Sequence, residues 1–197
     1  MRKFIIVLFL IFSLQSLTKA DDIGDYEIEG ISIGDSLLDY FSETEILQTY
    51  AGIYPNKKYF QVDINDGSKF EEYQKMQFHV INNDNKYRVH ALSGEITFDN
   101  IDSCLSKKKE IFYIFKDVIK DAEIHDLGKR EHVVDKSGES VSYDVYFWFK
   151  DDSVIGISCY DWSAKAVKEF NTIDNHLQVT LMNVEFATWI KGPAFKE

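Results

Sequence analysis

Alternation of hydrophobic and polar residues along the chain predicts its strands. The clearest stretches are YFQVDI (59–64), MQFHVI (76–81), KYRVHAL (86–92), SVSYDVYFWF (140–149), SVIGISCY (153–160) and HLQVTLM (176–182), with EHVV (131–134) and GEITF (94–98) as shorter ones. GEITF is either a separate strand or the continuation of the strand before it. Polar turns such as NNDN (82–85) and KDD (150–152) separate neighbouring strands, and tight turns favour antiparallel pairing.

Hydrophobic residues at helical spacing predict a first main helix after the turn GDS (34–36). Leu37, Leu38 and Phe41 form its apolar side. The segment SETE (42–45) fits a capping box, so a second helical turn is expected to run to about residue 50.

The second main helix carries the stronger pattern. Asp99 or Asp102 is expected to cap it. The basic run KKK (107–109) would oppose the helix dipole in a first turn, so a later start at Ser106 is the alternative. The apolar face of this helix comprises Leu105, Phe112, Phe115 and Ile119, widened by Ile111, Ile114 and Val118.

These elements predict an α+β fold, in which the two main helices cover one face of an antiparallel sheet. WSAKAVKEF (162–170) and VEFATWI (184–190) add short helices. Both halves of the chain follow a helix-then-meander order, although the similar stretches IGDSLL (33–38) and NIDSCL (100–105) are too short to establish a repeat. No linker or low-complexity tract divides residues 21–197, so we expect them to form a single domain.

The first twenty residues, MRKFIIVLFLIFSLQSLTKA, have the pattern of a secretory signal peptide. Arg2 and Lys3 precede an apolar run from Phe4 to Phe12, and Ala20 is a suitable last residue before cleavage. A membrane anchor is the alternative, but it needs about 20 consecutive apolar residues, and polar residues interrupt this run from Ser13 onward. The sequence therefore predicts a periplasmic or secreted protein without stable membrane insertion.

The chain is acidic, with 33 Asp and Glu residues, 22 Lys and Arg residues and a formal net charge of −11. Loss of residues 1–20 would remove Arg2, Lys3 and Lys19 and no acidic residue, which makes the remainder more negative still. Such a chain repels phosphate backbones, and KKK (107–109) is too small a basic footprint. We therefore expect no nucleic-acid binding, and the acidity favours solubility over a specific cationic partner.

Cys104 and Cys159 are the two cysteines of the chain. In an exported protein an even number of cysteines predicts a disulfide, which here would close a loop of roughly 55 residues and stabilise the fold by about 4 kcal/mol. A nucleophilic thiol is the alternative, because Cys104 lies near a predicted helix start, where a thiolate is favoured. An oxidising compartment favours the disulfide.

Motifs for common chemistries are missing or out of register, so we assign no catalytic, cofactor-binding or metal-binding residue. DINDGSKFEEY (63–73) is similar to a calcium-binding loop, but its glycine stands at the wrong position and Gln74 stands where a glutamate is needed. His79 and His90 flank one predicted hairpin, yet two histidines would lack a third zinc ligand. No GxSxG, HExxH, P-loop or GxGxxG pattern occurs, while a Ser-His-Asp site assembled in space stays open.

An aromatic run supplies the candidate interaction surface. In a strand, Tyr146 and Trp148 face one way, while Phe147 and Phe149 face the other. One pair should enter the core, and the other is either covered by a helix or exposed for recognition. We take Tyr146 and Trp148 as the candidate surface. The whole run comprises Tyr143, Tyr146, Phe147, Trp148, Phe149, Tyr160 and Trp162.

The stretch GISIGDSLLDYF (30–41) resembles the helix opening of small envelope proteins of the SmpA/OmlA type, which help to assemble outer-membrane proteins. The turn-helix-meander plan is similar to that of secreted β-lactamase-inhibitor-like modules. With ISCYDWS (157–163), the chain also resembles uncharacterised secreted bacterial proteins. It lacks the lipid-bearing cysteine and the Leu-Gly pair of the first group, so the resemblance assigns no functional residue.

Two functions are consistent with these features. The first is a non-enzymatic binding or assembly module of the bacterial envelope, whose partner is another envelope protein or a small ligand. The alternative is a small secreted hydrolase, with acids or a thiol brought together in a cleft. A bond between Cys104 and Cys159 would exclude the thiol version.

Overall fold

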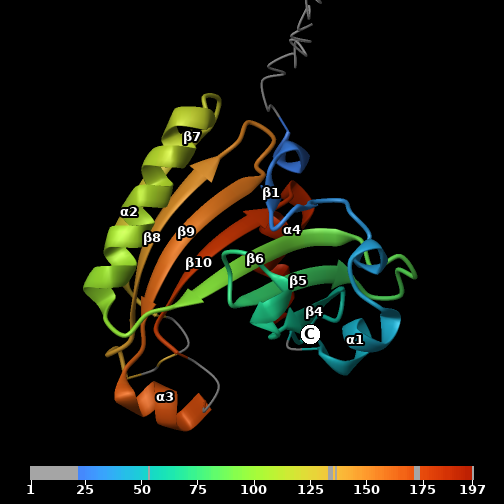
Figure 1. The fold of residues 1–197 in the computed structure, drawn as a ribbon, viewed down its shortest axis with the longest axis horizontal. Helices are drawn as coiled ribbons and strands as arrows, with labels where there is room; N and C mark the ends of the chain where they lie inside the picture. The colour runs from blue at the N-terminus through green and yellow to red at the C-terminus, as the bar shows by residue number, and fades with distance from the viewer. Residues whose placement is uncertain (1–21, 53, 133–134, 136, 171–173, 197) are drawn as a thin grey trace, which may run out of the picture.

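The computed structural model describes residues 22–52, 54–132, 135, 137–170 and 174–196 (Figure 1). The predicted signal peptide, residues 1–20, and the last two residues of the predicted strand EHVV lie outside these ranges. Eight strands form one antiparallel sheet in the order β3-β4-β5-β6-β10-β9-β8-β7. The fold is therefore α+β, as the sequence predicts.

The sheet consists of two four-stranded meanders that meet at their last strands, β6 and β10. Helix α1 (Glu43–Gln48) precedes the first meander and helix α2 (Ile101–Val118) precedes the second, so both halves have the predicted helix-then-meander order. The first meander contains β3 (Tyr50–Ala51), β4 (Tyr59–Ile64), β5 (Lys75–Ile81) and β6 (Val89–Thr97), and the second contains β7 (Glu123–Glu131), β8 (Val141–Trp148), β9 (Val154–Asp161) and β10 (His176–Met182).

Shorter elements complete the fold. β1 (Glu27–Ile28) and β2 (Ile31–Ser32) form a separate hairpin, and a 3-10 turn at Leu37–Asp39 leads toward α1. Helix α3 (Ala164–Phe170) joins β9 to β10, and helix α4 (Val184–Ile190) follows β10. Within the described ranges, no helix combines the length and the apolar character that crossing a membrane would require.

One face of the sheet, which we call the front face, packs against α1 and α2 (Figure 1). Val145, Phe147 and Ile157 lie on this face and are buried, because alternate residues of β8 and β9 point toward α2. A disulfide joins Cys104 of α2 to Cys159 of β9, with a Cα–Cα distance of 6.0 Å. The disulfide predicted from the sequence is therefore confirmed, and it fastens α2 to the second half of the sheet.

The opposite face, which we call the rear face, differs between its two halves. Over the first half, α4 packs Phe186 and Trp189 against Tyr59 of β4 and Ala91 of β6, and all four side chains are buried. Over β7, β8 and β9, the same face is hollowed into a groove. This contrast sets the position of the candidate site.

Helix capping follows the sequence for α1 and departs from it for α2. The Ser42 side chain accepts a hydrogen bond from the Glu45 N–H, and the Glu45 carboxylate accepts one from the Ser42 N–H, as in the predicted capping box. Helix α2 is capped by Asn100 and not by Asp99 or Asp102, and it does not start at Ser106. Asn100 has the extended backbone that a cap needs, and its side chain reaches the first turn.

Other expectations were wrong in identifiable ways. Strand β7 was missed, because it is an edge strand with every residue exposed and carries no apolar alternation. Residues 86–88 belong to the connection between β5 and β6, where Tyr87 has a φ of 48°. Ile114 and Val118 are 53% and 60% exposed, so α2 buries a narrower face than expected.

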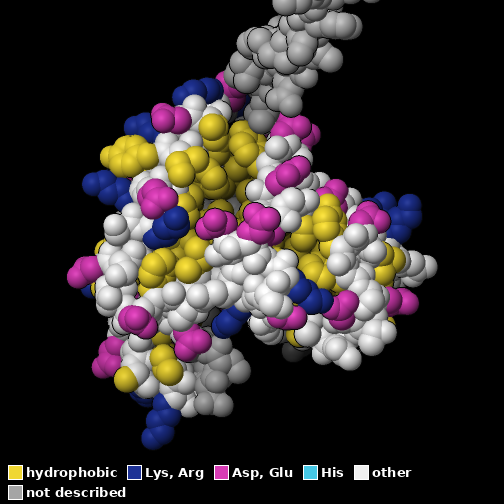
Figure 2. All heavy atoms as spheres, viewed as in Figure 1, with side chains coloured by type: hydrophobic (Ala, Val, Ile, Leu, Met, Phe, Trp, Pro, Cys, Tyr) yellow, Lys and Arg dark blue, Asp and Glu magenta, His cyan; other side chains and the backbone are white. Residues whose placement is uncertain are grey.

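Figure 2, which views the front face, shows hydrophobic side chains in the shallow pocket beside α2.

Candidate functional site

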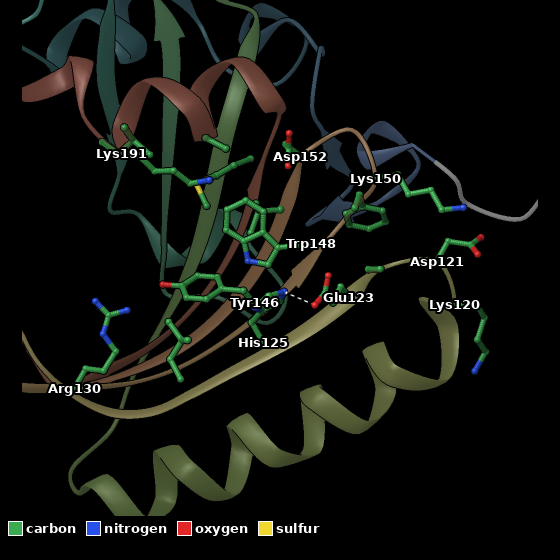
Figure 3. A pocket seen from close by; sticks show the side chains of 17 residues that line it. Lys120, Asp121, Glu123, His125, Arg130, Tyr146, Trp148, Lys150, Asp152 and Lys191 are labelled. Atoms are coloured by element: carbon green, nitrogen blue, oxygen red, sulfur yellow. Dashed lines mark ion pairs between the residues drawn. The ribbon is translucent and has the colours of Figure 1, made fainter.

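A groove of about 1150 Å³ lies on the rear face of the second half of the sheet (Figure 3). Side chains from β7, β8, β9, β10 and α4 line it, together with the segment before β7 and the turn after β8. Its apolar surface comprises Ala122, Leu127, Tyr146, Trp148, Phe149, Val154, Met182, Ala187 and Ile190. A groove of this size and composition suits a ligand with a substantial apolar part.

Tyr146 and Trp148 lie in the middle of the groove because they alternate with the buried residues of β8 (Figure 3). Tyr146 lies opposite Gly156 of β9, and a β-carbon on Gly156 would stand 2.9 Å from the tyrosine ring. The glycine therefore lets the ring lie close against the sheet. Burial, with Asp144 nearby, raises the pKa of the Tyr146 hydroxyl, so this side chain is neutral at physiological pH.

Four basic side chains surround this aromatic pair: Lys120, Arg130, Lys150 and Lys191. Arg130 lies toward one end of the groove, and Lys120 and Lys150 lie toward the other (Figure 3). The Lys191 ammonium stands 3.7 Å from the centre of the Trp148 ring, which is a cation–π contact. None of the four forms an ion pair with a carboxylate of the described residues.

The groove also holds one histidine–carboxylate pair. Nε2 of His125 lies 3.2 Å from Oε1 of Glu123, and both residues belong to the exposed edge strand β7. Among the described residues that line the groove there is no Ser, Thr or Cys to serve as a nucleophile. Cys104 and Cys159 are bonded to each other, which excludes the thiol version of a hydrolase.

The aromatic cluster under α4 is closed, unlike the groove, and its side chains pack around a buried histidine. His79 is buried, its Nε2 lies 3.1 Å from the Tyr54 hydroxyl, and its ring lies 4.5 Å from that of Phe186. Complete burial lowers the pKa of His79 to about 3, so the ring is neutral. His90 lies next to Asn183, with 3.0 Å between Nδ1 and the amide nitrogen. Burial also lowers the pKa of His90.

The polar residues considered as metal ligands have structural roles in the described ranges. Asp66 caps the 3-10 turn Gly67–Lys69 between β4 and β5, so the stretch similar to a calcium loop is a turn. Asp63 accepts hydrogen bonds from Gln61 and Gln77 on the rear face. Within the described part of the chain, no three His, Cys, Asp or Glu side chains are grouped so that they could hold a metal ion.

Sequence reasoning placed Tyr146 and Trp148 together on one face but missed most of the groove around them. Met182 and Lys191 belong to β10 and to the end of α4, and the chain fold alone brings them to β8. His125 and Arg130 lie on the unrecognised strand β7. The alternation in HLQVTLM indicates that Met182 and Thr180 point to the same face of β10. No sequence signal pairs β10 with β9, so Met182 could not be assigned to the groove.

Comparison of the chain with protein families, with curated proteins and with solved structures finds no match.

Proposed function

We propose that this chain is an exported, non-enzymatic binding or assembly module of the bacterial envelope, and that it holds its partner in the groove around Tyr146 and Trp148. The observation that carries the proposal is the difference between the two halves of the rear face. In the first half, the protein covers its own aromatic residues with α4. In the second half, Tyr146 and Trp148 line an open groove.

The composition of the groove supports this proposal. Tyr, Trp, Met and Arg are enriched where proteins bind partners, because their large side chains contribute much contact area, and for Tyr and Trp this area comes at a low cost in conformational entropy. All four residue types line the groove. The Cys104–Cys159 disulfide supports export, since disulfides persist in oxidising compartments.

A small secreted hydrolase is the second candidate, and the pairing of His125 with Glu123 favours it. The pair would have to activate water directly, because the described lining residues offer no hydroxyl or thiol nucleophile of the Ser, Thr or Cys type. Both side chains are exposed, so they are not shielded from bulk water. The binding role therefore has the stronger support.

The experiment is affinity capture from bacterial envelope extract, with the mature protein immobilised. Tyr146→Ala combined with Trp148→Ala should lose the bound protein or small molecule. The matched control is Tyr113→Ala combined with Ile114→Ala, since these two residues are exposed on α2, on the opposite side of the sheet. The control should retain the partner.

The outcomes separate the two candidates. Retention of every bound component by a folded groove variant would contradict the binding role. Hydrolysis of ester, peptide or glycoside substrates by the wild type, together with its loss in His125→Ala, would establish the hydrolase instead. Circular dichroism on each variant shows whether the protein remains folded.

A further inference from the structure

We infer that the groove selects an anionic amphiphile, a small molecule with an apolar chain or ring system and a carboxylate-type head. This inference rests on the proposed function and names the ligand class for the same site. Its basis is the charge of the groove compared with that of the chain. The lining holds four Lys or Arg side chains and three Asp or Glu side chains, whereas the whole chain has 22 basic and 33 acidic residues.

The apolar part of such a ligand has a continuous surface to lie on. Tyr146, Trp148 and Val154 supply the sheet side, and Met182 and Ile190 supply the side toward α4. The volume of about 1150 Å³ is large enough for a chain of ordinary detergent or fatty-acid length. Burial of an alkyl chain here contributes affinity in proportion to the apolar area removed from water.

The charged part of the ligand has cations within reach beside the Trp148 ring and at the Arg130 end of the groove. Lys191 is the best placed, because its ammonium already stands 3.7 Å from the centre of the Trp148 ring, so a carboxylate bound to it would keep its chain beside the indole. Arg130 supplies a second cation toward one end of the groove, whereas Lys120 and Lys150 share the other end with Asp121, Glu123 and Asp152, so the anionic head is expected at the Arg130 and Lys191 side (Figure 3). None of these four cations is engaged by a carboxylate of the described residues.

The same arrangement disfavours a cationic ligand. Lys191 occupies one face of the Trp148 ring, where a ligand ammonium would otherwise bind. Of the three carboxylates in the groove, Glu123 is already paired with His125, and Asp121 and Asp152 lie in the segments that flank β7 and β8. The small excess of basic over acidic side chains in the lining therefore adds to the loss of the indole face.

The test is isothermal titration at low salt with three ligands, each kept below its micelle concentration: decanoate, decyltrimethylammonium and the neutral octyl glucoside. We expect decanoate to bind most tightly, and its affinity to fall as salt is raised, since added ions screen charges at the rim of a groove. Trp148→Ala should abolish binding. Lys150→Glu combined with Lys191→Glu should weaken decanoate binding by about tenfold or more and improve binding of the cation.

A control variant carries the same change in net charge away from the groove. Lys57→Glu combined with Lys165→Glu alters two exposed lysines that do not line it and should leave decanoate affinity within about twofold of the wild type. Equal binding of all three ligands, or an equal loss in both lysine variants, would overturn the selection for anions.

Failure of this inference is distinguishable from failure of the proposed function. If decanoate does not bind but capture from envelope extract still depends on Tyr146 and Trp148, the binding role stands and the small anionic ligand is wrong. An acidic protein segment recovered as the groove partner would give that result. If neither decanoate nor any extract component depends on the two aromatic residues, both proposals are wrong.

Discussion

The two halves of the rear face are built on similar strands, but a helix covers one half and an open groove lies on the other. β4, β5 and β6 place Tyr59 and His79 on this face, and α4 covers both. β8 places Tyr146 and Trp148 on the same face, where they line a groove. The difference arises after the last strand of each half, since β6 runs on toward α2 on the front face and β10 runs on into α4. A single terminal helix closes one half only, which leaves the aromatic residues of the other available to a partner.

The largest effect should come from removing the cover of the first half. Phe186→Ala deletes a side chain that is 2% exposed and should lower the free energy of unfolding by about 3–5 kcal/mol, through lost burial and the cavity left behind. Trp148→Ala in the open half should cost only about 1 kcal/mol, since this ring is partly exposed already. Urea unfolding of both variants measures the contrast, and equal losses would mean that the groove is an ordinary part of the core.

In the second half, the Cys104–Cys159 disulfide links α2 to β9 on the front face of the sheet. Cys104→Ala combined with Cys159→Ala should lower the free energy of unfolding by about 4 kcal/mol, because the unfolded chain regains the freedom of the closed loop. Hydrogen exchange should accelerate first in α2 and β9. If hydrogen exchange accelerated equally in β4 and β5, the disulfide would stabilise both halves of the sheet alike.

The covered half should be sensitive to acid through its buried histidine. His79 has a pKa of about 3 in the folded state and an ordinary value of 6.5, so between these values the unfolded chain binds more protons. Stability should therefore fall by about 2 kcal/mol from pH 7 to pH 5. His79→Gln keeps a polar partner for Tyr54 without titrating, and urea unfolding at both pH values should show a smaller loss. The same pH dependence in the variant would assign it to other groups, such as His90.

The smallest effect concerns the start of the covering helix. The Asn183 side chain accepts a hydrogen bond of 2.9 Å from the Phe186 N–H. Asn183→Ala should therefore cost about 1 kcal/mol. Asn183→Ser retains an accepting oxygen and should recover most of that loss in the same unfolding assay. No recovery would mean that contact with His90, and not capping, explains the role of Asn183.

Much of the fold could be predicted from the sequence because local rules act within each element. The limits of β4, β10 and α4 follow from strand alternation or helical spacing in YFQVDI, HLQVTLM and VEFATWI, each of which is bounded by polar residues. β7 could not be found in this way, since an edge strand exposed on both faces needs no apolar alternation. Its existence depends on pairing with β8, which is a tertiary contact.

The candidate site was less predictable than the fold. Alternation within β8 placed Tyr146 and Trp148 on one face, but the sequence offered no means to decide whether a helix would cover them. That decision depends on where α4 lies, and α4 is far from β8 along the chain. The basic residues around the pair could not be assigned either, because Lys120, Arg130, Lys150 and Lys191 come from four separate segments.

The most direct test of the central claim is partner capture by the folded Tyr146→Ala/Trp148→Ala variant. The account predicts that capture from envelope extract is lost while the variant still unfolds cooperatively in urea, with a loss of stability of only about 1–3 kcal/mol, because these residues serve binding more than stability. Undiminished capture by this folded variant would contradict it.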